Sequence, residues 1–292
     1  MKSSGALSVI ELFDEGLHSG VNLALNVEKV LYREKTDLQD LMIFENSTFG
    51  RVMSLDGAVQ TTEKDEFIYH EMFVHVPLLA HGNVRRVLII GGGDGGAARQ
   101  LMKYEDIAVT LVDIDRTVIE LSKKYMPSIS GGALDDPRLD LVIADGCRFV
   151  KETDQHWDVI IIDSTDPHGP GEVLYTAEFY GDCKSCLAPG GIITTQNGVP
   201  FVQESELRQS YDRLGALFAD VTFYQAAIPS YVGGDMAFGW ATDEKSHRSR
   251  SLAELAETYM NSGIETHYYT PEVHQAAFAL PLHVQKILTR EA

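Results

Sequence analysis

The stretch VLIIGGGDGG, residues 87–96, is the most informative part of this 292-residue sequence. Four apolar residues of the kind found in a buried strand lead directly into six residues of glycine and aspartate. A helix-forming stretch, 97–104, and a second apolar run, 108–112, come next. This order predicts a strand, a loop, a helix and a second strand. Because glycines let the backbone approach a ligand and a helix N-terminus exposes N–H groups, the loop is a candidate binding site.

Further apolar runs of strand length follow the glycine loop, with helical patterns between them. This alternation predicts a parallel sheet covered by helices. The runs lie at residues 139–144, 159–162, 192–195 and 221–224, and a strand at 237–241, a helix at 252–261 and a short helical tail end the chain.

The residues before the glycine loop have a different pattern. Short β-branched and apolar runs separated by turn residues predict a small β meander, and a helical period begins at Glu66. We therefore expect an N-terminal β domain, residues 1–65, and an α/β domain, residues 66–292. The α/β domain is expected to have a Rossmann-like, mostly parallel sheet like that of class I S-adenosylmethionine methyltransferases. The N-terminal runs lie at residues 27–32, 38–44, 51–55 and 58–62.

The composition narrows the classes of partner. The chain has 24 Lys and Arg against 43 Asp and Glu, a net charge of −19, which disfavours binding to nucleic acid and favours a cationic ligand. Three cysteines suggest a reducing compartment rather than a disulfide framework. The sequence shows neither a signal peptide nor a long apolar span, so we expect a cytoplasmic protein that does not enter a membrane.

Four aspartates indicate which ligand the glycine loop receives. The loop fits the pattern G-x-G-x-x-G, which by itself suits a dinucleotide, an S-adenosylmethionine-type ligand or a plain turn. Asp94, inside the loop, repels a pyrophosphate but suits an amino group. Asp113, at the end of the second strand, is placed to bind ribose hydroxyls, whereas Asp115 suits a helix N-cap. Asp145 follows the third strand, where an adenine amino group can bind. The predicted ligand is an adenosine without phosphates.

The strand at residues 157–162 runs into two further acids, Asp163 and Asp166. Two carboxylates three residues apart at the end of a buried strand are costly unless a cation lies beside them. An Asx turn before Pro167 is an alternative explanation for Asp166 but leaves Asp163 unexplained.

Metal binding and redox chemistry have weaker support. His70, Glu71 and His75 suggest zinc, but the two histidines are five residues apart rather than the four that place both on one helical face. Cys183 and Cys186 fall in a predicted helix, where packing explains them. We expect no metal site.

Six segments of the chain resemble, in order, the spermidine synthase family of polyamine aminopropyltransferases, bacterial type. The resemblance runs from about residue 13 to the C-terminus. It implies transfer of an aminopropyl group from decarboxylated S-adenosylmethionine to putrescine, giving spermidine and methylthioadenosine. The segments are LDGAVQTTEKDEFIYHEM (55–72), LIIGGGDGGAARQ (88–100), LVDIDRTVIELSKKYMP (111–127), DPRLDLVIADG (136–146), DVIIIDSTDPHGPGEVLYTAEFY (158–180) and IPSYVGG (228–234).

The resemblance also implies roles for residues and partners. Asp163 is expected to accept a proton from the amine. No cofactor is expected, since decarboxylated S-adenosylmethionine is a co-substrate, and the family implies a homodimer or homotetramer. The donor or methylthioadenosine side is expected to comprise Gln39, Asp94, Asp113, Asp145, Gly146 and Pro170. The polyamine side is expected to comprise Tyr69, His70, Asp94, Asp163, Ser164, Thr165, Asp166, Gln196 and Tyr231.

The chain departs from the family pattern at four positions. Asp113 stands where the family usually has Glu, and Phe13 where a Trp is common. His168 and Asp235 stand where apolar residues are expected. The last two bear on which acceptor is used rather than on the reaction.

Three other functions have less support from the sequence. A class I methyltransferase must accommodate the carboxylate of intact S-adenosylmethionine, which Asp94, Asp163 and Asp166 together disfavour. A dehydrogenase would need contacts for a nicotinamide and a pyrophosphate, for which the sequence offers no candidates. A non-catalytic polyamine sensor would be expected to have lost the base, yet Asp163 is present.

Overall fold

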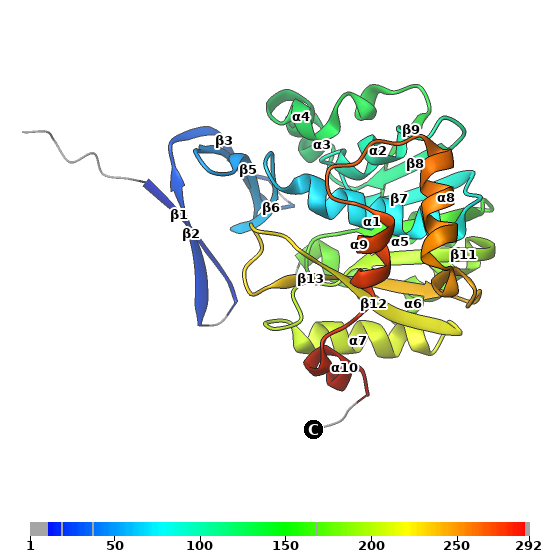
Figure 1. Ribbon diagram of the computed structural model, residues 1–292. Coiled ribbons are helices and arrows are strands. Elements are labelled where there is room, and N and C mark those ends of the chain that lie inside the picture. The colour runs from blue at the N-terminus through cyan, green and yellow to red at the C-terminus, as the bar shows by residue number, and fades with distance from the viewer. Residues whose placement is uncertain (1–10, 19, 37, 168, 290–292) are drawn as a thin grey trace, which may run out of the picture. The chain divides into compact units, whose positions relative to one another are not determined.

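The computed structural model describes residues 11–18, 20–36, 38–167 and 169–289. Of residues 169 and 170 it describes the backbone alone. The chain divides into two compact units, Met1–Lys64 and Asp65–Ala292 (Figure 1). The division falls one residue before the boundary expected from the sequence. None of the helices among the described residues is long and apolar enough to cross a membrane.

The first unit is built from two antiparallel sheets. Strands β1 (Glu11–His18) and β2 (Val21–Val27) form a hairpin, and four more strands form a meander. Asp56 and Gly57 both have positive φ, as a two-residue hairpin turn requires. The meander strands are β3 (Lys29–Lys35), β4 (Asp40–Asn46), β5 (Gly50–Leu55) and β6 (Ala58–Thr62).

The first unit differs from the expectation in two places. Strand β1 and nearly all of β2 come before the first expected run, which begins at residue 27. The run at residues 27–32 is not one strand, because β2 ends at Val27 and β3 begins at Lys29. No glycine or proline lies at this division, so the pattern of apolar residues does not indicate it. Phe13, on β1, packs in the core of this unit with its ring 5.2 Å from that of Phe44.

The second unit contains a seven-stranded sheet in the order β12-β13-β11-β10-β7-β8-β9. The strands from β9 to β11 in this order are parallel, and β13 runs antiparallel between β11 and β12. This arrangement confirms the predicted mostly parallel, Rossmann-like sheet. The strands are β7 (Arg86–Gly91), β8 (Ala108–Asp113), β9 (Leu139–Ile143), β10 (Trp157–Asp163), β11 (Leu187–Gln196), β12 (Asp220–Ala227) and β13 (Asp235–Thr242).

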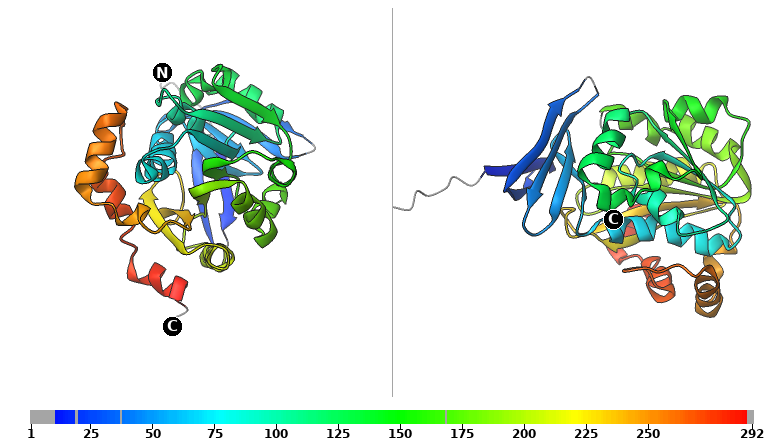
Figure 2. Two further views of the ribbon diagram at one scale, coloured as in Figure 1. Left: turned by 90° about the vertical axis from the view of Figure 1, so that its right-hand side faces the viewer. Right: turned by 90° about the horizontal axis from the view of Figure 1, so that it is seen from above.

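Helices cover both faces of this sheet (Figures 1 and 2). Alternate residues of β7 supply the two cores: Val87 and Ile89 pack towards α1, and Leu88 and Ile90 pack towards α6. Each fully buried side chain of this kind contributes about 1.5–3 kcal/mol. The helices are α1 (Glu66–His81), α2 (Gly96–Leu101), α3 (Arg116–Tyr125), α4 (Pro127–Ser130), α5 (Gly146–Glu152), α6 (Ala177–Ser185), α7 (Glu204–Gly215), α8 (Leu252–Ser262), α9 (Pro271–Ala277) and α10 (Leu282–Thr289).

Helix α1 is buried around nearly its whole circumference, so its polar side chains need hydrogen-bond partners inside the protein. The Glu71 carboxylate accepts hydrogen bonds from the backbone N–H groups of His267, Tyr268 and Tyr269, at 2.7–3.0 Å. His75 contacts Tyr104 and Gln100, and burial lowers its pKa to about 3. Glu71 and His75 therefore anchor α1 within the core.

The cysteines are packing residues. Cys183 and Cys186 are buried free thiols at α6, and the thiol of Cys186 donates to the carbonyl of Val150 at 3.1 Å. Burial raises the pKa of Cys183 and raises that of Cys186 to about 11, so both stay protonated.

Candidate active site

The glycine loop follows β7 and lies against the carboxyl end of β10. Gly91, Gly92 and Gly95 have φ values of 83°, 72° and 79°, a left-handed conformation that glycine adopts without strain. The N–H of Gly92 donates to the carbonyl of Asp163 at 3.0 Å, and a Cβ at Gly91 would clash with that same carbonyl oxygen. The loop therefore requires glycine to lie directly against the end of β10.

Two more glycines leave space that side chains of the site occupy. A Cβ at Gly93 would lie 2.7 Å from Oδ2 of Asp113, and a Cβ at Gly96 would overlap the ring of His70. These close approaches bring together α1, β8 and β10, whose chemical groups are far apart in the sequence.

Asp94 lies at the start of α2 and faces His70. Its Oδ1 accepts the N–H of Gly96 at 2.9 Å, and its Oδ2 lies 3.4 Å from Nε2 of His70. The side chain is 14% exposed. Burial favours protonation, but the charge of His70 and its hydrogen bond outweigh it and hold the pKa of Asp94 below its usual value. Asp94 is therefore a carboxylate.

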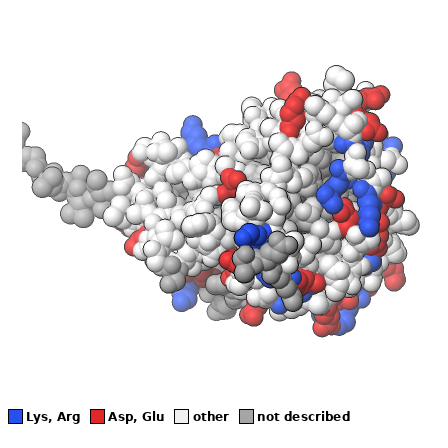
Figure 3. Space-filling view, turned by 60° about the horizontal axis from the view of Figure 1, so that its bottom comes forward, with Lys and Arg blue, Asp and Glu red and all other residues white. Residues whose placement is uncertain are grey.

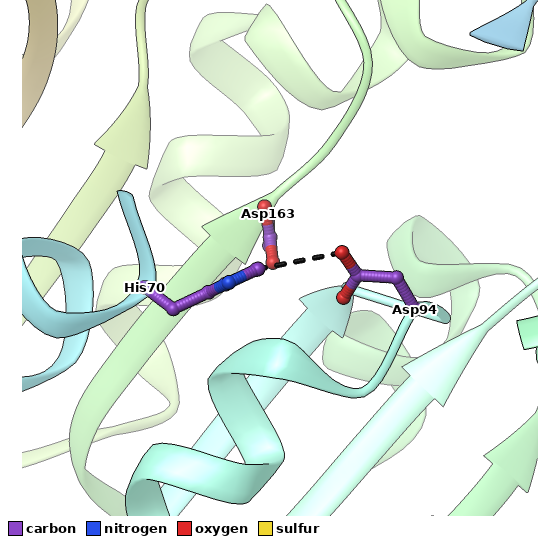
Figure 4. A group of neighbouring side chains, drawn as sticks. All are labelled: His70, Asp94 and Asp163. Atoms are coloured by element: carbon purple, nitrogen blue, oxygen red, sulfur yellow. Dashed lines mark ion pairs between the residues drawn. The ribbon is translucent and has the colours of Figure 1, made fainter. Parts of the chain in front are cut away.

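His70 lies between two carboxylates. Its side chain is 3% exposed, and its Nδ1 lies 2.7 Å from Oε2 of Glu66. Burial by itself lowers the pKa of His70, but the charge of Asp94 and the hydrogen bonds to Asp94 and Glu66 raise it to about 10. Figure 4 shows the imidazole pointing from α1 towards Asp94 and Asp163.

Asp163 ends β10 and receives the hydroxyl of Tyr69. The hydroxyl donates to Oδ1 at 2.6 Å. Burial, followed by the charge of Asp94, raises the pKa of Asp163 to about 6. Burial and the neighbouring carboxylate also raise the pKa of Tyr69, so the phenol remains a donor. A carboxyl group with this pKa is suited to accept a proton near neutral pH.

The residues after Asp163 form a polar loop held by one tyrosine. The Asp166 carboxylate accepts the side-chain N–H of Gln196 at 2.9 Å. The Tyr175 hydroxyl contacts Oγ of Ser164 at 3.3 Å, the carbonyl of Thr165 at 3.1 Å and Oε1 of Gln196 at 2.5 Å. The predicted group of Ser164, Thr165, Asp166 and Gln196 is thus brought together, with Tyr175 at its centre.

Tyr231, which was predicted for the polyamine side, lies beside Tyr69. Its ring lies 6.2 Å from that of Tyr69 in an edge-to-face arrangement. The loop that carries it is fixed by the buried Asp65, which accepts the N–H of Ser230 at 2.7 Å. Burial raises the pKa of Tyr231, and the charges of Asp163, Asp65, Asp94 and Asp166 raise it further. Asp235 lies exposed at the start of β13.

The residues predicted for the donor side include two aspartates at neighbouring strand ends, Asp113 and Asp145. Asp113 accepts the N–H of Asp115 at 2.8 Å, and burial raises its pKa to about 6. Asp115 caps α3 through the N–H of Thr117, as expected. Asp145 caps α5 through the N–H of Arg148, and a Cβ at Gly146 would lie 2.5 Å from Ile90.

Other donor-side predictions stay open. Gln39 belongs to the first unit, where its carbonyl accepts the N–H of Thr36 at 2.9 Å. The side chain of Pro170 and all of His168 lie outside the described residues. Their predicted roles remain predictions.

Among the residues that the structure describes, His70, Asp94 and Asp163 have potential ligand atoms within 4.8 Å of one another. Three such atoms are close enough to surround one cation. However, both ring nitrogens of His70 already face carboxylates, so an ion pair explains the imidazole. His75 does not belong to this cluster, because its ring nitrogens contact Tyr104 and Gln100.

Three residues of the site were not predicted: Glu66, Arg99 and Tyr175. All three lie inside the segments that carry the family resemblance. The spacing of four residues between Glu66 and His70 was the available signal, since it places both side chains on one face of a helix. Nothing local indicated that Arg99, 33 residues beyond Glu66, would pair with it.

The surplus of acids is divided between surface and site. On the face of the molecule in Figure 3, acidic and basic side chains are interspersed. Asp94, Asp163 and Asp166 gather instead at the carboxyl ends of parallel strands, where α/β enzymes bind their ligands. The fold and this edge define a Rossmann-like α/β enzyme with an acidic, tyrosine-lined active site.

Comparison with known proteins gives the family. Residues 66–250 match the model of the spermine/spermidine synthase domain, and residues 12–63 match that of the spermidine synthase tetramerisation domain. The chain therefore belongs to the spermine/spermidine synthase family, and it is a polyamine aminopropyltransferase.

Individual relatives agree with this assignment. The polyamine aminopropyltransferases of Shigella sonnei and Escherichia coli O1:K1 are 52% and 53% identical over 278 residues, covering 95% of this chain and 96% of each relative. A crystal structure of spermidine synthase with the transition-state analogue AdoDATO has a TM-score of 0.91 at 36% identity and covers 100% of both chains. Spermidine synthase from Thermotoga maritima has a TM-score of 0.89 at 36% identity, covering 96% of this chain and 95% of its own.

Proposed function

We propose that this aminopropyltransferase is a spermidine synthase that uses putrescine as acceptor and Asp163 as general base. The donor is decarboxylated S-adenosylmethionine, and the products are spermidine and methylthioadenosine. The observation that carries the proposal is the meeting of Asp94, Tyr69 and Asp163 at one point of the sheet edge. That a related spermidine synthase has been crystallised with a transition-state analogue supports a reaction of small molecules.

We assign the binding of the donor to Asp94, Asp113 and Asp145. Asp94 pairs with the amino group of the aminopropyl chain, Asp113 receives the ribose hydroxyls and Asp145 the adenine amino group. Gln39, Gly146 and Pro170 complete this side. Intact S-adenosylmethionine would bring a carboxylate towards Asp94 and Asp163, and like charges at this distance repel.

The acceptor amine must lose a proton before it can attack. An alkyl ammonium has a pKa of about 10.4, so having the neutral amine at pH 7 costs about 4.6 kcal/mol. Burial in the site and the positive sulfonium of the donor both lower this pKa. Asp163 then takes the proton, and the neutral nitrogen displaces methylthioadenosine from the propyl carbon in line with the C–S bond. The sulfonium is already an activated leaving group, so positioning supplies much of the remaining rate enhancement.

The other end of the acceptor is held as a cation. Asp166, fixed by Gln196, offers a carboxylate to the distal ammonium, while Tyr69 and Tyr231 line the methylene chain. Ser164 and Thr165 shape the loop, and His70 lies behind the reacting nitrogen. We propose that the reaction uses no cofactor and no metal.

We further propose that the protein acts as a homotetramer in the cytoplasm. The match of residues 12–63 to a tetramerisation domain supports assembly through the first unit. Sedimentation equilibrium measures the number of subunits directly, and a monomer would contradict the proposal.

The test of the substrate assignment is an acceptor panel with decarboxylated S-adenosylmethionine. Putrescine is expected to have the highest kcat/KM among putrescine, cadaverine, 1,3-diaminopropane and spermidine, and intact S-adenosylmethionine should donate nothing. Asp235→Ile serves as the paired variant, because Asp235 is exposed where the family has an apolar residue. A changed ranking in this variant would make Asp235 a specificity residue. A preference of the wild type for spermidine would contradict the proposal.

The reaction should also lose rate in acid. Asp163 accepts a proton only when ionised, so kcat/KM for putrescine is expected to fall as the pH drops through about 6. Asp113 also has a pKa of about 6, so kcat/KM for the donor should fall more steeply, with up to two protons involved. In Asp113→Asn, the fall of kcat/KM for the donor with decreasing pH should involve close to one proton. Rates independent of pH down to about pH 5 would argue against a carboxylate base.

A further inference from the structure

A buried glutamate faces His70 from the side opposite Asp94. The carboxylate of Glu66 lies 2.7 Å from Nδ1 of His70, and Asp94 lies 3.4 Å from Nε2. Both ring nitrogens of His70 therefore face carboxylate oxygens. The reaction proposed above gives Glu66 no role, although burying a carboxylate is costly unless it is paired.

Arg99 pairs with both carboxylate oxygens of Glu66. Its Nη2 lies 2.7 and 2.8 Å from the two carboxylate oxygens of Glu66, and its Nη1 donates to the carbonyl of Ser128 at 2.8 Å. A guanidinium stays protonated throughout the physiological range, so a carboxylate paired with it stays negative. On the other side, Asp94 accepts the N–H of Gly96 and is likewise an acceptor.

Two ionised carboxylates determine the protonation of the ring between them. A neutral imidazole carries one N–H and one lone pair, so one of its nitrogens would point a lone pair at a negative oxygen. Only the doubly protonated ring donates in both directions. The order Arg99, Glu66, His70, Asp94 then alternates positive and negative charge.

We propose that Glu66 is a positioning residue that, together with Asp94, holds His70 as a fixed cation beside Asp163. The ring cannot turn away, because it lies against Gly96, where even a Cβ would overlap it. The charged or titratable groups facing the ring are Glu66 and Tyr69 on α1, Asp94 in the glycine loop and Asp163 at the end of β10.

The fixed cation has two consequences for the reaction, both of which rest on Asp163 being the base. First, its charge opposes the protonation of Asp163 that burial and Asp94 favour, and so keeps the base ionised at neutral pH. Second, a positive ring near the attacking nitrogen disfavours the ammonium form of that nitrogen. Glu66 would therefore assist the proton transfer without touching either substrate.

The charge of His70 can be read in the wild-type protein without any substrate. We expect nitrogen-15 NMR to show one histidine ring that stays doubly protonated up to about pH 9, well above the ordinary histidine pKa of about 6.5. Loss of that signal in His70→Gln identifies it. His75 and His274 have pKa values of about 3 and stay neutral at these pH values. If no ring is doubly protonated at about pH 8, the proposal is wrong.

Two variants test the link to catalysis. In Glu66→Gln the titration of His70 should move below neutral pH, so that the ring is largely neutral where Asp163 titrates. The pH at which kcat/KM for putrescine falls on the acid side, here called the acid limb, should then rise by about one unit. His70→Gln should move the limb in the same direction, and the double variant should move it no further. Glu120→Gln, an exposed change of the same charge on α3, should leave the limb in place.

The possible outcomes separate the two proposals. A Glu66 role confined to packing would lower kcat/KM equally at every pH and leave the acid limb unmoved, which would overturn the inference. Should Glu66→Gln fail to fold, the wild-type spectrum and the His70→Gln profile still decide it. Failure of Asp163 as base would instead appear as an active Asp163→Asn enzyme, whatever the charge of His70.

Discussion

Asp163→Asn is expected to lower kcat by about two to four decades, the usual contribution of a general base. The amide keeps the shape of the side chain and can still accept the hydroxyl of Tyr69, but it cannot take a proton from the acceptor. Steady-state kinetics with putrescine measure the loss. Methylthioadenosine affinity, measured by calorimetry, should be nearly unchanged because the adenosine contacts remain.

The same variant should be more stable than the wild type. The pKa of Asp163 is about 6 in the folded protein, above its ordinary value of 3.8, so its contribution to folding is fully present below pH 3.8 and is lost as the pH rises through about 6. At neutral pH the buried carboxylate therefore destabilises the fold, and the uncharged amide removes this cost. We expect a higher Tm at pH 7 and a smaller difference at acid pH, measured by calorimetry.

Asp166→Asn is the matched variant for this prediction. Asp166 holds the distal ammonium but takes no proton, so its amide should raise the KM for putrescine more than it lowers kcat. If Asp163→Asn instead turns over at nearly the wild-type rate, Asp163 is not the base. A fall in Tm would contradict the assigned cost of its burial.

Asp94→Asn is expected to lower kcat/KM for decarboxylated S-adenosylmethionine by about two to three decades. Removing one partner of a buried ion pair costs about 2–5 kcal/mol. Here the loss leaves the donor ammonium without its counter-charge and leaves His70 with Glu66 as its remaining carboxylate partner. The affinity for methylthioadenosine, which has no aliphatic amine, should change little. Comparing the two ligands by kinetics and calorimetry isolates the amino-group contact.

The control for Asp94 is Asp140→Asn, the same change at an exposed position on β9, which should leave both ligands unaffected. An equal loss of affinity for donor and methylthioadenosine would mean that Asp94 maintains the glycine loop rather than the amino group. Unchanged donor kinetics would remove Asp94 from the site.

The strands of the seven-stranded sheet and the start of α1 could be read from the sequence because their signals are local. Apolar runs, glycines and N-caps act over a few residues, so β7, β8, β10 and α1 fall near their expected positions. Where the local signal was absent the prediction was wrong, as at residue 28, between β2 and β3.

The identity of the acids was likewise visible in the sequence. Parallel strands end at one edge of a sheet, so Asp94, Asp113 and Asp163 were expected to meet there. Four glycines of the loop explain how they meet, because a Cβ at Gly91, Gly92, Gly93 or Gly96 would occupy space taken by Asp163, Asp113 or His70.

The sequence by itself therefore determined the α/β fold and the acids of the site. Only the tertiary structure decided their protonation and their partners. Tyr69 reaches Asp163 across 94 residues, and Arg99 reaches Glu66 across 33. The pKa of each group depends on burial and on charges a few ångströms away, and those distances are fixed by how α1 and α2 pack on the sheet. No local pattern contains that information, because the interacting groups become neighbours only when the chain folds.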